Sequence, residues 1–533
     1  MNSSKPQVII IGSGINSLVC AALLSIWGKS VLVLERNAVL GGCIRTEELF
    51  PGYIHDVLSC WYPLFLSSPA YQVLKPELEK AGVEFIQSDY STGLVQTNGR
   101  GIALKRGVLP AALQLDEIAG KDGEAFRYMV QQILHDDAEL VFSLLGQNPY
   151  GFSVLRLLFN EWRKRGIDGL VEFAGHSLET FRRWSERELQ SDFIRTLIAP
   201  WALHTGLGPD DASSALIGKL TFAAVVAGGM PVVKGGSISI VEALKMIIEQ
   251  YGGQLLTHTN VDHIITHQRG RKYRASGVIA GERVYHATDA VVCNVTPQQL
   301  YGHLLDNVPQ TVQQYAQGYR YGRGGMQVHF ALNSPPSWSD PKLCHVPLIH
   351  LAESMQEICL SVTQANNGYL PEHPTLAIGQ PVALDPGRAP EGGWILWIQM
   401  QELPTHLKGD ALGEIPIPED GKWNDAVREA FADRVQARLE RVIPGFSSTI
   451  VGRRAYSPAD LQTLNCNLVG GDPYSGICTP DQFFWLRPFA SSKRTKAHQT
   501  FICNVFHIGA SAHPGPGLAG TSGYLVARRL ARH

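Results

Sequence analysis

The sequence predicts an α/β protein whose main sheet is parallel and is assembled from segments far apart in the chain. Three observations lead to this prediction. Residues 8–35 show a strand–helix–strand pattern with a glycine-rich turn, residues 231–251 show a second glycine-rich turn and a helix, and residues 501–532 show an apolar stretch, further glycines and a last helix. None of these segments can bury its apolar residues alone, so we expect them to share one sheet.

The first segment contains two strands joined by a helix. Val8–Ile11 and Val31–Leu34 are unbroken apolar runs rich in β-branched residues, which predicts strands buried on both faces, as in a parallel sheet. Between them, apolar residues recur at helical spacing from Leu18 to Ile26, and Gly28 marks the end of the helix.

The turn between the first strand and the helix predicts a dinucleotide site. Gly12 permits a sharp turn, and Gly14 lets a pyrophosphate approach the backbone where the helix N-terminus offers unpaired N–H groups. Glu35, 21 residues after Gly14, ends the second strand and is placed to hold both ribose hydroxyls of an adenosine. Ser17 stands where a third glycine or alanine is expected. The predicted cofactor contacts of this segment are Gly12, Ser13, Gly14, Asn16, Ser17 and Glu35. The alternative is a glycine turn with a purely structural role.

The residues after Glu35 favour FAD over NAD. Arg36 follows the acid, the doublet Gly41-Gly42 comes six residues beyond it, and Arg45-Thr46 follows. This order resembles the second flavin motif of the amine oxidase and phytoene desaturase superfamily. The paired glycines let a loop pass close to a cofactor, and Arg45 offers a guanidinium to phosphate or flavin oxygens.

The two later segments resemble further flavin-binding parts of the same superfamily. Pro231–Gly236 leads into an amphipathic helix, and the resemblance places the backbone of Val261 beside the adenine. Gly515–Gly520 repeats the GxGxxG pattern, but only 13 residues follow it, so it cannot begin a second strand–helix–strand unit. By resemblance, Gly509 and Ala510 lie along the pyrophosphate and ribityl chain, and Gly517, Leu518 and Ala519 face the flavin ring near the start of the last helix.

The resemblance is to phytoene desaturase-type flavoproteins, within the branch of pyridine nucleotide-disulphide oxidoreductase domain-containing protein 2. Gly52–Asp56, Gln380–Gly392 and Gly470–Asp472 support that branch. It implies a Rossmann-type FAD-binding domain built from discontinuous segments, and a mixed-sheet substrate domain with a helical cover. We expect the FAD-binding domain over residues 1–64, 231–300 and 455–533, and the substrate domain over residues 65–230 (mainly helical) and 301–454 (mixed sheet).

The implied function is that of an FAD-dependent oxidoreductase: a desaturase, dehydrogenase or oxidase. It would take a hydride from a fairly apolar small molecule, such as a polyene, a carotenoid or another secondary metabolite, onto flavin N5. Three alternatives stay open: a flavin amine oxidase, a redox-neutral isomerase that uses reduced FAD, and a non-catalytic lipid-binding module like Rab GDP dissociation inhibitor. The last loses parts of the flavin motifs, whereas this chain retains all three segments. Oxygen or a quinone is the expected electron acceptor.

His513 is the first candidate for proton transfer, because the resemblance places it on the loop that reaches the flavin. His55 and Asp56 are further candidates near the ring. Asp472 and Arg487 are weaker ones, since Asp472 is equally suited to capping a turn and Arg487 to pairing with a cofactor or a carboxylate.

Composition excludes several other classes of protein. The 533 residues carry a net charge of -2, so no basic excess is present to bind nucleic acid. The nine cysteines show no tight pairing, which argues against a disulphide framework or a metal site. No secretion signal and no run of 18 apolar residues is visible, so we expect a cytoplasmic protein. Residues 154–165 read as a basic amphipathic helix, which leaves open a peripheral contact with a membrane.

Overall fold

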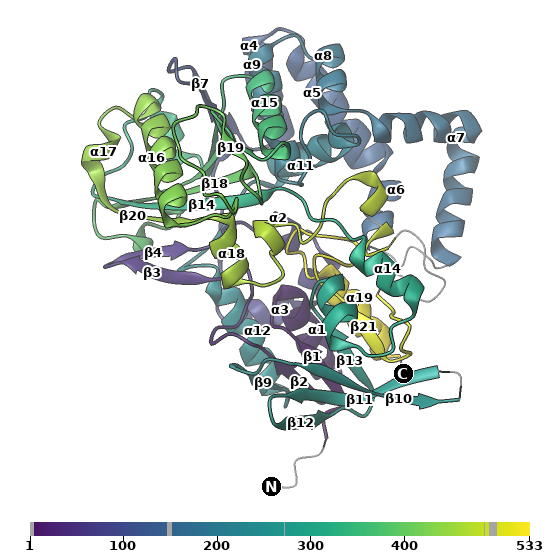
Figure 1. Cartoon of the computed structure of the whole chain (residues 1–533). Coiled ribbons are helices and arrows are strands. Elements are labelled where there is room, and N and C mark those ends of the chain that lie inside the picture. The colour runs from purple at the N-terminus through teal and green to yellow at the C-terminus, as the bar shows by residue number, and fades with distance from the viewer. Residues whose placement is uncertain (1–4, 147–151, 271, 484–485, 490–497, 533) are drawn as a thin grey trace.

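Five strands from distant parts of the chain form one parallel sheet (Figure 1). The structure, a computed structural model, describes residues 5–146, 152–270, 272–483, 486–489 and 498–532. The order of the strands is β21-β13-β1-β2-β9, and every neighbouring pair is parallel. The predicted α/β architecture from discontinuous segments is therefore confirmed. The strands are β1 (Val8–Ile11), β2 (Val31–Leu34), β9 (Gln254–Leu256), β13 (Ala290–Cys293) and β21 (Val505–His507).

Both faces of this sheet are covered, which explains why its central strands are apolar throughout. Helices α1 (Ile15–Ile26), α12 (Ile238–Gln250) and α19 (Thr521–Leu530) share one core with one face. A three-stranded antiparallel sheet packs on the other face. It consists of β10 (His263–Arg269), β11 (Lys272–Ala280) and β12 (Arg283–His286).

A second, seven-stranded sheet forms the other half of the molecule, with the order β20-β14-β18-β17-β15-β6-β7. It is mixed, as predicted, because β6 and β15 pair parallel and the other neighbours are antiparallel. The region predicted to be mainly helical thus also supplies two strands of this sheet, the edge strand β7 and its neighbour β6. The strands are β6 (Tyr90–Val95), β7 (Gly101–Lys105), β14 (Gly324–Leu332), β15 (Leu348–Leu351), β17 (Leu376–Gly379), β18 (Trp394–Leu403) and β20 (Ile450–Tyr456).

Helices cover the mixed sheet on both faces. On one face α16 (Asp425–Val442) closes an apolar core. On the other face lies a group of helices from the middle of the chain. They are α4 (Val108–Ile118), α5 (Asp122–Gln131), α8 (Phe181–Glu188), α9 (Asp192–Ile198), α10 (Pro200–Leu203), α11 (Ser214–Gly228) and α15 (Met355–Asn366).

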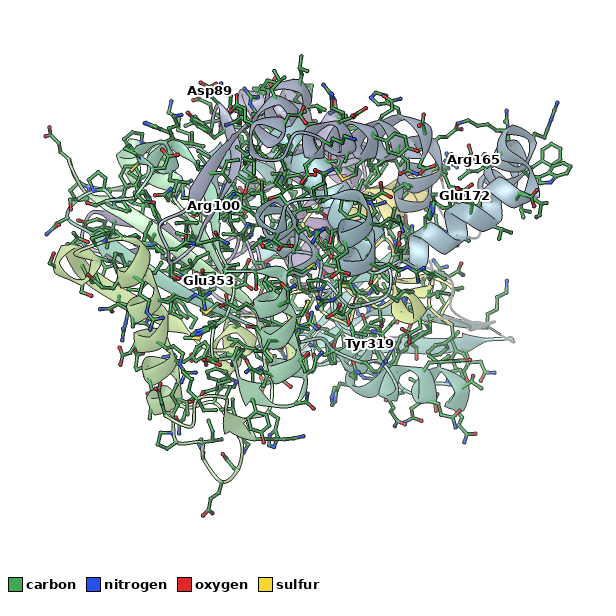
Figure 2. All side chains as sticks on the ribbon, turned by 90° about the horizontal axis from the view of Figure 1, so that it is seen from above. Asp89, Arg100, Arg165, Glu172, Tyr319 and Glu353 are labelled. Atoms are coloured by element: carbon green, nitrogen blue, oxygen red, sulfur yellow. The ribbon has the colours of Figure 1, made fainter. Side chains whose placement is uncertain are left out.

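One long helix, α7 (Phe152–Leu178), extends away from the body of the molecule (Figure 1). It bends at Gly166, whose φ of 72° is outside the helical range. Figure 2 shows Arg165 and Glu172 on this helix at the edge of the molecule. Arg165 anchors the helix through its ion pair with Asp137, and it also pairs with Glu161 one turn earlier on the same helix. Among the described residues, no helix is both long and apolar enough to cross a membrane.

Candidate functional site

One cavity of about 660 Å³ lies at the carboxyl ends of the parallel strands. Its walls include the turn after β1, residues 259–262 and the loop after β21. The first and last of these belong to segments predicted from the sequence, and residues 259–262 include the predicted Val261, but the mid-chain turn and helix at residues 231–251 do not border the cavity. Ligands of doubly wound sheets bind at this edge, and the size falls within the range of cofactor sites. The predicted cofactor residues that border the cavity are Gly12, Ser13, Gly14, Asn16, Glu35, Arg36, Gly41, Gly42, Val261, Ala510, Gly517 and Leu518.

The chemistry of this cavity fits an FAD. Gly14 occupies the N-cap position of α1, and no side chain of the described residues caps that helix end, so its N–H groups are available for a phosphate. Glu35 borders the cavity where an adenosine ribose would lie. The cavity borders residues 259–262, where the resemblance places the adenine, and residues 515–518, where it places the flavin ring.

Asn294, directly after β13, holds the first turn together and was not identified from the sequence. Its side-chain amide donates to Ser17 Oγ at 3.0 Å. A Cβ atom at Gly14 would lie 3.0 Å from Asn294 Nδ2, and one at Gly509 would lie 2.1 Å from Asn294 Oδ1. Asn294 therefore explains why residues 14 and 509 are glycines. It also explains why a serine, whose hydroxyl accepts this hydrogen bond, stands at position 17.

Glu35 is 5% exposed, and its carboxylate accepts hydrogen bonds from other residues of the protein. Its Oε2 accepts hydrogen bonds from the backbone N–H and the hydroxyl of Ser13, at 2.9 and 2.7 Å. Its Oε1 accepts from the N–H of Asn37 at 2.8 Å. A carboxylate has about four acceptor positions. Roughly one of them is left for a ribose hydroxyl, fewer than the two contacts that the sequence predicts.

The glycine doublet lies directly against the first turn. Gly14 and Gly41 form a parallel β-bridge, and a Cβ atom at Gly42 would lie 3.2 Å from Gly14 Cα. Arg45 and Thr46 do not border the cavity. Arg45 pairs with Glu47, while Thr46 Oγ1 donates to Asp56 and accepts from the N–H of Ile238. Together with Ser17, Gly509 and Ala519, they are predicted cofactor residues outside the lining, and their contact with a cofactor stays a prediction.

A buried ion-pair network joins the flavin-like segments to each other. Arg388 donates to Asp56 at 2.6 Å and to Asp385 at 3.0 Å, and the Asp56 and Arg388 side chains are fully buried. Asp56 also accepts from the N–H of Ser237, and Asp385 from that of Gly235. The network fastens the hairpin β3 (Thr46–Phe50) and β4 (Tyr53–Asp56) to the turn before α12. Asp56 is therefore a structural anchor in this arrangement.

A strap formed by Leu464–Val469 closes one side of the cavity. It follows α18 (Pro458–Leu464), and sequence reasoning missed it because its residues form no recognisable pattern. Residues 465–469 all border the cavity. Four hydrogen bonds hold the strap to the cofactor-binding segments: Asn37 Nδ2 to Leu464 O, Asn465 Nδ2 to Cys43 Sγ, Gln299 Nε2 to Cys466 O, and Asn467 Nδ2 to Asn294 O.

The histidine candidates are buried. His513 is fully buried and does not border the cavity, and its carbonyl accepts from His498 Nε2 at 2.7 Å. Burial lowers the pKa of His498 to about 3, with the charge of His513 as the next cause. His55 packs edge-on against His329 at 5.2 Å, and burial holds the pKa of His55 well below its ordinary value. Proton transfer by His513 stays a prediction.

The two weaker candidates have structural partners. Asp472 accepts N–H groups of Gly322, Tyr474 and Gly476 at 2.7–2.8 Å, so it caps a turn. Burial raises the pKa of Asp472, and these hydrogen bonds oppose that rise. Arg487 donates to Ala510 O at 2.7 Å, which positions the loop after β21 at the cavity. Among the described residues, no group of three acidic, histidine or cysteine side chains is arranged for a metal ion.

Comparison with known proteins supports the predicted resemblance. A family model described as an NAD(P)-binding Rossmann-like domain matches residues 10–75. Pyridine nucleotide-disulfide oxidoreductase domain-containing protein 2 of Rattus norvegicus is 26% identical, over 97% of this chain and 92% of that protein. Lycopene-forming phytoene desaturase of Pantoea ananas is 26% identical over 97% of each. A limonene dehydrogenase polypeptide of Castellaniella defragrans is 22% identical, over 99% of this chain and 94% of that protein.

Solved structures share the fold over nearly the whole chain. An oxidoreductase from Methanosarcina mazei has a TM-score of 0.61 at 15% identity, covering 98% of this chain and 99% of that one. A triple mutant of putrescine oxidase has a TM-score of 0.58 at 14% identity, covering 99% of both chains. The predicted resemblance to phytoene desaturases is confirmed by these relatives, and so is the predicted class of enzyme, an FAD-dependent oxidoreductase. The likeness to putrescine oxidase shows a shared fold.

Proposed function

We propose that this FAD-dependent oxidoreductase removes a hydride from an apolar small molecule, as a desaturase or dehydrogenase does. The cavity that the first turn, residues 259–262 and the tail loop border together carries the proposal, because a dinucleotide such as FAD is long enough to contact all three segments. The names of the phytoene desaturases and of the limonene dehydrogenase support an apolar substrate.

In this proposal, different segments of the chain bind different parts of FAD. The first turn and the N-terminus of α1 bind the pyrophosphate, and Glu35 and Val261 bind the adenosine. Gly517 and Leu518, before α19, lie at the flavin ring. The strap excludes water from one side. When bound, FAD supplies a ring that accepts a hydride, and oxygen or a quinone is the acceptor that reoxidises it.

The test is anaerobic reduction of the purified, yellow protein. Apolar polyenes, terpenes and amines are added one at a time, and the flavin absorbance is followed. Bleaching by a hydrocarbon or its alcohol supports the proposal. Bleaching by amines alone favours an amine oxidase, and product formation without net bleaching favours an isomerase; either result overturns the proposal.

We also propose that α7 contacts the surface of a membrane. Leu155, Trp162 and Val171 are 64%, 48% and 65% exposed, on a helix that extends away from the body of the molecule (Figure 1). Arg163 and Lys164 are exposed beside them. Apolar side chains next to cationic ones suit an anionic lipid surface, from which an apolar substrate would enter.

A further inference from the structure

One face of the mixed sheet carries buried polar side chains beside an apolar core. The strand register puts Gln327, Gln399, Ala377 and His350 in one row across β14, β18, β17 and β15. Side chains in one row point to the same face. This is the face covered by the helices from the middle of the chain, since Ala377 belongs to the core that these helices share.

A hydrogen-bonded chain of neutral groups runs along this row. The Gln401 side-chain nitrogen donates to Gln399 Oε1 at 3.0 Å and contacts His204 Nδ1 at 3.2 Å. His204 Nε2 and His350 Nε2 lie 2.8 Å apart. Burial lowers the pKa of His204 to about 4, and burial and then His204 hold the pKa of His350 well below its ordinary value. Both imidazoles are therefore neutral at pH 7.

The direction of this chain fixes both tautomers. With the Gln401 amide nitrogen facing it, His204 Nδ1 accepts, so the proton of His204 sits on Nε2. His204 then donates to His350 Nε2, and the proton of His350 sits on Nδ1. That Nδ1–H is buried and has no acceptor among the described residues.

Three indole N–H groups near His350 are also buried donors without an acceptor among the described residues. The Nε1 atoms of Trp61, Trp201 and Trp397 are buried and lack an acceptor among the described residues. Trp201 stacks on His204 with ring centroids 4.9 Å apart and meets the edge of His350 at 5.0 Å. Trp61 meets Trp397 at 5.0 Å. Buried N–H donors are nearly always satisfied in proteins, so four in one cluster point to a missing acceptor.

A short segment, residues 61–64, connects the cluster to the cofactor cavity, although no cluster residue borders that cavity. Trp61 lies over Gly379 in the next row of the sheet, where a Cβ atom would lie 2.1 Å from the indole ring. Three residues later, Leu64 packs against Gly517, since a Cβ atom there would lie 2.6 Å from Leu64 Cδ1. Gly517 borders the cofactor cavity. One short segment thus spans from the tail loop to the cluster.

We infer that this imidazole–indole cluster (Trp61, Trp201, His204, His350, Trp397 and Gln401) is the substrate site, and that it binds an uncharged oxygen acceptor of an otherwise apolar substrate. His350 Nδ1–H is the principal donor, and the indoles supply apolar walls and further N–H groups. The inference rests on the proposed function and narrows its substrate class to oxygenated molecules: aldehydes, ketones or alcohols. A carboxylate would be left unpaired, because the cluster contains no cation.

Binding of matched ligand pairs to the holoprotein tests this inference. The probes are limonene with carvone and farnesene with farnesal, in which the second member adds an oxygen acceptor. Quenching of tryptophan fluorescence reports binding, because three tryptophans line the cluster. The oxygenated member should bind roughly tenfold tighter, since it satisfies a buried donor. Equal affinity within each pair, or no binding by any probe, would overturn the inference.

Three variants separate recognition from folding. His350→Phe should abolish the preference for oxygen while binding of the hydrocarbons persists, and His350→Gln, which keeps an N–H donor, should retain part of it. His373→Phe is the matched control, because His373 lies outside the cluster with 40% of its side chain exposed. An unchanged preference in His350→Phe would overturn the inference. FAD content is measured in parallel: colourless wild-type protein refutes the proposed function, whereas yellow protein without an oxygen preference refutes only the substrate site.

Discussion

The guanidinium of Arg388 and the carboxylate of Asp56 meet at 2.6 Å with both side chains fully buried. They are 332 residues apart in the chain. The pair joins the hairpin that follows the glycine doublet to residues 385–388, in the half of the molecule that contains the mixed sheet. A charge pair that water does not reach therefore joins the two halves of the molecule.

Removing Arg388 should be costly, because it leaves Asp56 and Asp385 buried without their cation. For Arg388→Met we expect a loss of about 3–5 kcal/mol in the free energy of unfolding. The change is followed by thermal and urea denaturation of the holoprotein. Lys234→Ala removes the exposed pair with Glu84 and should leave the melting temperature close to that of the wild type, because water screens exposed charges. Equal melting temperatures for the two variants would refute the anchoring role.

Acid should destabilise the protein through its buried histidines. Burial lowers the pKa of His329 to about 4, against an unfolded value of about 6.5. Below pH 6.5 the unfolded state therefore binds a proton that the folded state does not, so stability falls as the pH drops from about 6.5 to about 4 and levels off below.

The variant His329→Gln measures how much His329 contributes to this pH dependence of stability. His329→Gln keeps an N–H that can reach the carbonyl of Val57, the partner of His329 at 3.1 Å, but it cannot titrate. Urea denaturation across this pH range should show a slope lower by about 1.4 kcal/mol per pH unit, the value for one proton. An unchanged slope would show that His329 is not buried and neutral.

The strap should slow the release of FAD. Asn467→Ala removes the 3.0 Å hydrogen bond to the carbonyl of Asn294, which is worth about 0.5–1.5 kcal/mol. We therefore expect FAD to dissociate about 2–10-fold faster. Release is measured as the rise of flavin fluorescence in the presence of an apoflavoprotein trap. Asn98→Ala, in an exposed turn, should release FAD at the wild-type rate. No difference between the two variants would contradict the role of the strap.

Membrane contact by α7 should depend on its charge and on its aromatic side chain. Wild-type protein should sediment with vesicles of phosphatidylcholine and phosphatidylserine, and less so with phosphatidylcholine alone. Trp162→Ser and the double change Arg163→Glu with Lys164→Glu should each weaken binding. Trp27→Ser, at an exposed tryptophan on the parallel-sheet half, is the matched control. If all variants sediment to the same extent, α7 does not make the contact with the membrane.

Local patterns predicted the elements of the parallel sheet well. The runs at Val8–Ile11 and Val31–Leu34 are strands with these bounds, because a strand buried on both faces must be apolar at every position. The positive φ angles of Gly12, Gly41 and Gly42 likewise follow from glycine turns that the sequence displays.

Contacts between residues far apart in the chain could not be predicted from the sequence. Asn294 was not among the residues predicted for the site, and its contacts with Ser17 and Gly509 depend on the folded loops. The pairing of His204 with His350 joins a short helix to a strand 146 residues later, and no spacing rule connects them. Such contacts arise from tertiary packing, which leaves no periodic signal in one sequence.

The absorbance spectrum of the Gly14→Val variant, compared with wild type, tests the central claim most directly. Wild-type protein should be yellow, with a flavin band at about 450 nm. The valine side chain would meet Asn294 and occupy the space through which a pyrophosphate approaches, so the variant should be colourless but folded. Gly120→Ala, where a Cβ atom meets nothing within 4 Å, should stay yellow. A fully yellow Gly14→Val protein would contradict the claim that the first turn holds the phosphates of FAD.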